Sequence, residues 1–143
     1  MYSKAEMQQL KKDFWIAFAQ EYPRKWLLYD TKIKDFSFKF YADNKKVAVM
    51  LDIEMKDDEK RIAYFEKLES LNTVLAEDYL DDAVFWHDLV LENGKTISRV
   101  CVERYGMGLT NKNQWPEIFA FFAEKMQAFE LFFYEFEDFI QDI

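Results

Sequence analysis

Four charged residues in the first half of the sequence have types and spacing that suit metal-dependent chemistry: Asp35, Asp52, Glu54 and Lys56. Two alternating apolar and polar runs, 36–41 and 47–55, flank Asp43-Asn44, a pair typical of a tight hairpin turn. A two-residue turn there sets Asp35 opposite Asp52, with Glu54 and Lys56 on the same outward face. Facing carboxylates repel each other. A divalent cation held by Asp35, Asp52 or Glu54 would remove that repulsion, and Lys56 would stabilise a developing charge.

This arrangement resembles the PD-D/ExK nuclease superfamily, in which an Asp on one strand and a Glu-x-Lys on its hairpin partner hold Mg²⁺ for phosphodiester hydrolysis. The resemblance implies that Asp35, Glu54 and Lys56 are the catalytic residues and Mg²⁺ the cofactor. The chain departs from the pattern because Lys34, not proline, precedes Asp35. The alternative is a solvated sheet face, with no cofactor, whose acids pair with Lys39 or Lys56.

The lone cysteine and lone histidine argue against several other chemistries. Cys101 cannot form an internal disulfide, which favours a reduced, cytoplasmic setting. Its neighbours Val100 and Val102 predict a small buried residue on a strand. His87 has no second histidine for a paired zinc site, and we expect it to be packed or at the surface. Three glycines cannot build a phosphate loop or a dinucleotide fingerprint.

The spacing of apolar residues predicts one α+β domain over residues 1–143. Ser3 and Glu6 form a capping box for a helix from about residue 4 to 21, ended by Pro23. Residues 26–30 are interpreted as a short strand, and a second helix runs from Asp57 or Asp58 to about residue 80. The predicted order is α-(β)-β-β-α-β-β-α, a mainly antiparallel sheet of two hairpins packed with three helices.

The turns set the register of the two predicted hairpins. In the first, the turn at Asp43-Asn44 places three apolar pairs on one face: Phe40 with Val47, Phe38 with Val49 and Phe36 with Leu51. In the second, the runs 83–92 and 96–105 flank Asn93-Gly94, a strong turn signal.

The most aromatic segment predicts a long last helix from about residue 114 to 142. Its apolar seam includes Phe129, Phe133, Phe136 and Ile140, and further phenylalanines widen the apolar arc. Either this helix is clamped between the sheet and the other helices, or part of the arc closes a homodimer. The second interpretation makes those four residues the interface.

Charge is unevenly distributed in a chain with a net charge of −8. Residues 1–46 hold ten Lys/Arg and six Asp/Glu, whereas residues 117–143 hold one Lys and seven Asp/Glu. The acidic helix needs a basic partner or intrachain offsets from Arg24, Lys25, Lys32 and Lys34. The net charge argues against a nucleic-acid coat or a binder of anionic membranes, although the basic first third leaves DNA contact open. No apolar run is long enough for a membrane span, and the start is too polar for a signal peptide.

Five runs in order along the chain resemble a bacterial family, domain of unknown function 4268: `DFWIAF`, `YPRKWLLYDTKIKDFSFKFYADNKKVAVMLDIE`, `LENGKTISR`, `NKNQWPEIFAFF` and `FELFFYEFEDFI`. The resemblance implies a small single-domain protein. It also implies a link to nucleic-acid metabolism, because some members place the domain after a nuclease-like domain. It supplies no catalytic residues.

Taken together, these patterns predict a small non-enzymatic interaction or assembly domain that self-associates through its last helix, with a homodimer or another protein as partner and no cofactor. The alternative is a PD-D/ExK-like nuclease, or an inactive relative, with Mg²⁺ at the first hairpin. A third hypothesis is an acidic mimic of DNA that occupies a basic site elsewhere.

Overall fold

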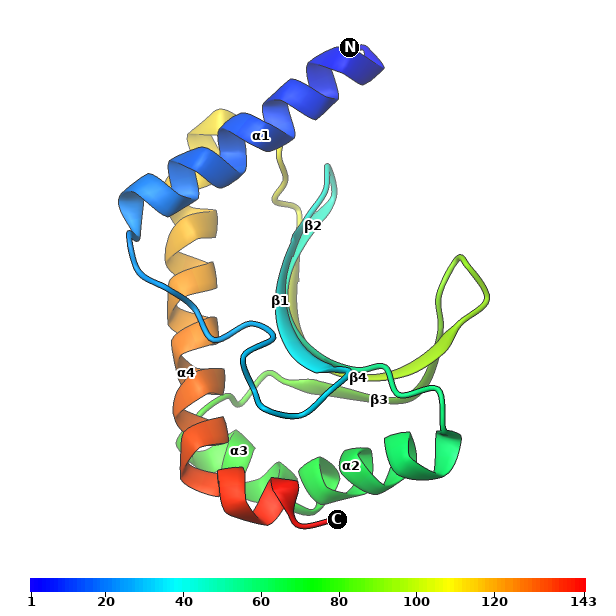
Figure 1. Ribbon diagram of the computed structural model, residues 1–143. Helices are drawn as coiled ribbons and strands as arrows, with labels where there is room; N and C mark the ends of the chain where they lie inside the picture. The colour runs from blue at the N-terminus through cyan, green and yellow to red at the C-terminus, as the bar shows by residue number, and fades with distance from the viewer.

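The computed structural model describes all 143 residues, as a curved sheet with its helices on one side (Figure 1). In chain order the elements are α1 (Lys4–Glu21), β1 (Phe36–Ala42), β2 (Lys46–Ile53), α2 (Asp58–Ser70), α3 (Asn72–Asp78), β3 (Val84–Val90), β4 (Thr96–Tyr105), the short 3-10 helix η1 (Lys112–Gln114) and α4 (Trp115–Gln141). The predicted α+β class and the long C-terminal helix are confirmed. None of the helices combines the length and apolar character needed to cross a membrane.

The four strands form one antiparallel sheet in the order β1-β2-β4-β3, so β2 and β4 join the two predicted hairpins. The register of the first hairpin differs from the prediction, because Phe40 lies opposite Val49 and not Val47. The cause is the turn. The backbone N–H of Asp43 donates to the Lys46 carbonyl at 3.0 Å, which makes Asn44 and Lys45 the turn residues. The shift is two residues, so each side chain keeps its predicted face.

Residues 26–30 contain a turn at 28–29 and no strand, so the expected strand there is wrong. Leu28 has a φ of 47°, a left-handed conformation that a strand excludes. Its carbonyl accepts a hydrogen bond from the Phe38 N–H at 2.9 Å. This segment therefore covers the outer edge of β1.

The expected helix from residue 57 to 80 is two helices, which meet at Leu71. The Leu71 N–H donates to the Leu68 carbonyl, three residues back, as in a tightened last turn. Nearby, the Ser70 hydroxyl donates to the Lys67 carbonyl at 2.6 Å. Such local side-chain bonds compete with helix continuation, and they account for the break.

The helices lie on the convex side of the sheet (Figure 1). α4 packs its aromatic seam there: the ring centroids of Phe129 and Phe133 lie 5.6 and 5.9 Å from that of Phe38. Nearer the start of α4, Phe122 contacts Phe14 and Phe18 of α1, whose capping box is confirmed. The clamped arrangement of the last helix is the one observed.

The opposite face of the sheet is concave, and no helix covers it (Figure 1). We call it the concave face. Because paired residues of an antiparallel sheet share a face, its side chains form rows across the strands: Lys46–Tyr105, Tyr41–Ala48–Glu103, Lys39–Met50–Cys101–Val84 and Ser37–Asp52–Arg99–Trp86.

Candidate functional site

The residues expected to form a metal site are only partly brought together. In the observed register Ser37, not Asp35, lies opposite Asp52. Asp35 lies beside Glu54, whose N–H donates to the Asp35 carbonyl at 2.7 Å, and the Asp35 side chain is exposed. Lys56 is exposed beyond the end of β2. No group of three or more His, Cys, Asp or Glu side chains is placed to hold a metal ion.

Lysine and arginine partners neutralise the acids of this region. Asp52, 2% exposed at its side chain, accepts from Arg99 through Nε–Oδ1 at 2.6 Å and Nη2–Oδ2 at 3.0 Å. Lys39 Nζ lies 2.8 Å from Glu54 Oε2 and 3.5 Å from Asp52 Oδ2. Lys95 Nζ approaches the other Glu54 oxygen at 3.7 Å. Pairing with Lys39 agrees with the solvated-face interpretation of the sequence.

The pKa values of this network follow from the balance of burial and pairing. Burial alone would raise the pKa of Glu54, but the hydrogen bond and charge of Lys39 outweigh it and lower that pKa below its ordinary value. Burial alone would lower the pKa of Lys39, but Glu54 and Asp52 raise it. Both groups are therefore held in their charged forms.

A cleft of about 370 Å³ lies on the concave face, between the β1–β2 hairpin and the β3–β4 turn. Its lining is mainly apolar, with a few charged groups: Tyr41, Lys46, Ala48, Met50, Leu89, Val90, Leu91, Glu92 and Arg99. Ala48 and Met50 are buried beside Cys101 and form an apolar patch on a face that no helix covers. A mainly apolar cleft with few polar groups is the usual form of a binding site.

Exposed apolar side chains extend the cleft along the concave face. Trp86 is 44% exposed and Val84 46%, and Tyr105 is 70% exposed. Lys46 Nζ lies 5.7 Å from the ring centroids of both Tyr41 and Tyr105. The hydrogen bond to Glu103 raises the pKa of Lys46 and keeps it charged.

Cys101 is the small buried residue that the sequence predicts. It is 1% exposed, and burial raises the pKa of its thiol to about 11. A thiol with that pKa is protonated at neutral pH and is a poor nucleophile.

The family model described as Domain of unknown function (DUF4268) matches residues 10–137. The chain belongs to the DUF4268 family. No curated protein and no solved structure matches this DUF4268 chain.

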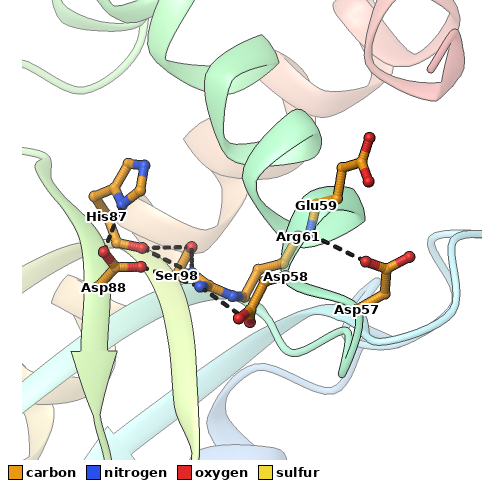
Figure 2. A network of polar contacts seen from close by, with 7 residues as sticks. All are labelled: Asp57, Asp58, Glu59, Arg61, His87, Asp88 and Ser98. Atoms are coloured by element: carbon orange, nitrogen blue, oxygen red, sulfur yellow. Dashed lines mark hydrogen bonds and ion pairs between the residues drawn. The ribbon is translucent and has the colours of Figure 1, made fainter.

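A second polar cluster of the DUF4268 domain lies on the helix-covered side of the sheet (Figure 2). Arg61 of α2 is 2% exposed, and it donates to the His87 carbonyl at 3.0 Å, to Ser98 Oγ at 2.6 Å and to Asp88 Oδ1 at 3.0 Å. The register of β3 shifts between Trp86 and Leu89, and this irregularity presents His87 and Asp88 to Arg61. A fourth partner is Asp58 Oδ1 at 3.4 Å. The cluster ties α2 to the bulge, and its arginine is already engaged by four groups of this chain.

Sequence reasoning missed Arg61, although a signal was present. Arg61 precedes Phe65 by four residues and Leu68 by seven, which places it on the buried face of its helix. The side chain of His87, whose carbonyl accepts from Arg61, is exposed, and its Nδ1 lies 2.9 Å from Asp88 Oδ2. This agrees with the expectation of a surface histidine.

The residues expected at a dimer interface lie largely inside the single chain. Phe129, Phe133 and Ile140 are at most 1% exposed, and Phe136 is half-buried. They belong to, or pack against, the main hydrophobic core of the chain itself. The large apolar residues that α4 leaves exposed are Leu131, Tyr134 and Phe139.

Four basic residues were expected to offset the negative charge of the last helix, and of these Arg24 forms an ion pair with it. Its Nη2 lies 2.6 Å from Oε1 of the buried Glu130, whose Oε2 accepts from the Leu27 N–H at 2.7 Å. Lys25 pairs with Asp30 instead, at 3.1 Å. Lys32 and Lys34 are exposed and have no acidic partner in the chain. The offset therefore fastens the segment after α1 to α4 without neutralising the helix as a whole.

Proposed function

We propose that the domain is a non-enzymatic binding module that takes a protein partner on its concave face. The observation that carries this proposal is the cleft of about 370 Å³ on the one sheet face that no helix covers. Ala48 and Met50 in its floor are buried, whereas Trp86 and Tyr105 on the same face are exposed.

The residues around the cleft support a protein as the partner. Trp, Tyr and Arg are the types that contribute most to protein interfaces, and Trp86, Tyr105 and Arg99 lie on this face. The exposed apolar residues reach beyond the cleft to Val84 and Trp86. A partner larger than a small molecule is needed to cover them.

Self-association through α4 has less support. The exposed apolar residues of α4 are Leu131, Tyr134 and Phe139, and Lys67 Nζ already lies 4.0 Å above the Phe139 ring. A stable homodimer buries on the order of 800 Å² or more on each partner. The exposed apolar surface of Leu131 and Tyr134 alone is too small for such an interface.

A metal-dependent nuclease has less support for a different reason. Asp52 and Glu54 are engaged by Arg99, Lys39 and Lys95, so a cation would have to displace these partners. The nuclease alternative predicts that Mg²⁺ or Mn²⁺ raises the melting temperature and supports DNA cleavage that Glu54→Ala abolishes. Our proposal predicts neither effect.

The proposal is tested by quantitative co-purification from native host cells with three forms of the domain: wild type, Trp86→Asp and Tyr134→Asp. Both substitutions place an acid at an exposed aromatic position, 44% exposed at Trp86 on the concave face and 56% exposed at Tyr134 on α4. We expect a protein that binds the purified wild type directly, is lost with Trp86→Asp and is kept with Tyr134→Asp. Loss with Tyr134→Asp alone would favour α4 as the binding surface and would contradict the proposal.

A further inference from the structure

The chemistry of the cleft indicates which part of a partner it accepts, if the proposed function holds. We infer that the cleft binds the C-terminal residue of the partner chain, with an apolar side chain on the floor and the terminal carboxylate on Arg99.

The apolar part of the inference comes from the lining. Ala48 and Met50 form the floor, and Leu89 and Leu91 come from the β3–β4 side. The volume of about 370 Å³ is near the lower end of the range for ligand pockets, about 300–1,000 Å³. A cleft of this size suits one terminal residue better than an extended chain that passes through.

The carboxylate part comes from the unused donors of Arg99. Asp52 engages Nε and Nη2, and no protein atom accepts from Nη1. The one buried side-chain nitrogen or oxygen without a partner is Arg61 Nε, so Arg99 Nη1 is accessible to solvent. The bidentate pair with Asp52 also fixes the guanidinium plane. Arg99 therefore offers a pre-oriented donor at a partly buried position, where a carboxylate forms its strongest hydrogen bonds.

The charges of the concave face balance one another, whereas the chain as a whole is strongly acidic. On this face, the three acids in the network, Asp52, Glu54 and Glu103, already have cationic partners. The cations facing them are Lys39, Lys46, Lys95 and Arg99. Glu92 is the one acid that lines the cleft, and Lys46 lines it as well. In a chain with a net charge of −8, this is a region where an added carboxylate meets little repulsion.

The test is an NMR titration with two peptide pools that differ only at the end of the chain. Each pool contains random tetrapeptides that end in Leu, Met, Phe or Trp. One pool has a free carboxylate and the other a C-terminal amide. We expect the acid pool to shift the amide signals of Met50 and Leu89 and the Nε–H signal of Arg99, with an apparent affinity at least tenfold higher than that of the amide pool.

Three variants locate the binding in the cleft, and one of them tests Arg99 itself. Arg99→Lys keeps a positive charge opposite Asp52 but removes the planar fork, and Leu91→Asp places an acid at the half-buried rim without touching the core. Both are expected to weaken binding of the acid pool at least tenfold. Lys39→Gln is the matched control, because Lys39 belongs to the same ionic network but does not line the cleft. It should bind as the wild type does. If Arg99→Lys does not fold, Leu91→Asp still decides.

The outcomes separate this inference from the proposed function. Equal binding of both pools at the cleft would overturn the role of the carboxylate and leave the binding module in place. Failure of both pools to move the cleft signals at millimolar concentration would overturn the inference, while the co-purification experiment judges the proposed function independently. Unchanged binding to Leu91→Asp would also overturn it.

Discussion

Arg99 on β4 and Asp52 on β2 face each other across the concave face, joined by two hydrogen bonds of 2.6 and 3.0 Å between the guanidinium and the carboxylate. Both side chains are mostly shielded, at 20% and 2% exposure. The pair lies between Trp86 and Ser37 in one cross-strand row. It thus connects the apolar cleft to the acids that sequence reasoning proposed as metal ligands.

Replacing Asp52 should destabilise the fold. Asp52→Ala leaves the Arg99 guanidinium largely buried without its bidentate partner, and we expect a loss of about 2–3 kcal/mol in the free energy of unfolding, measured by urea denaturation. Asp30→Ala is the control, because Asp30 pairs with Lys25 in solvent at 3.1 Å. Its loss should be below about 0.5 kcal/mol. Equal losses in the two variants would show that Asp52 is not a structural charge.

The contribution of Glu54 to stability should depend on pH. Its folded-state pKa lies below the ordinary value of 4.5. Protonation therefore favours the unfolded chain, so this contribution is complete above about pH 4.5 and is lost as the pH falls through the folded-state pKa. We expect the melting temperature of the wild type to exceed that of Glu54→Gln at pH 7 and the difference to shrink toward pH 3. A difference that grows on acidification would contradict the assigned ion pair with Lys39.

Gly108 should tolerate no side chain. A Cβ atom added there would lie 2.4 Å from the Asn44 carbonyl oxygen and 2.7 Å from that of Asp43, which are backbone atoms of the β1–β2 turn. We expect Gly108→Ala to cost about 2 kcal/mol or more in unfolding free energy, because the turn must move. Gly94→Ala meets no neighbour within 4 Å and is strained only by its φ of +84°. It should cost about 1 kcal/mol. The two are compared by urea denaturation, and a smaller effect at Gly108 would argue against the close approach.

Substitutions in the apolar seam of α4 should unfold the domain, as core substitutions do, and should not merely separate a dimer. Phe133→Asp places a charge at a position that is 1% exposed and in contact with the rings of Phe36 and Phe38. We expect this variant to lose its cooperative thermal transition. Tyr134→Asp, on the exposed side of the same helix, should melt within a few degrees of the wild type. A folded Phe133→Asp protein of altered oligomeric state, measured by light scattering, would restore the interface predicted from the sequence.

The sequence determined the elements better than their connections. The capping box of Ser3 and Glu6 and the turn at Asn93-Gly94 are local signals, and α1 and the second hairpin followed from them. The alternation of the first hairpin is unchanged by a shift of two residues, so it could not separate the predicted pairing of Phe40 with Val47 from the observed pairing with Val49. The turn chemistry of Asp43 decided the register.

The candidate site depended on features that the alternation pattern does not contain. The sheet's curvature and the placement of the helices on one side leave the concave face open, and no local signal encodes either. The buried residues Ala48, Met50 and Cys101 occupy outward positions, where polar residues are expected. Apolar residues at these outward positions were the one sequence signal that this face binds a partner.

Site-specific photo-crosslinking in a lysate of native host cells tests the binding surface most directly. Benzoylphenylalanine is placed at Trp86 or Tyr105 on the concave face, or at Tyr29 or Tyr134 elsewhere on the surface, all of which are exposed positions. We predict a discrete adduct with a partner protein from positions 86 and 105 that purified wild-type domain competes away and the Met50→Arg variant does not. Adducts only from position 134, or no competable adduct from positions 86 and 105, would contradict binding at the concave face.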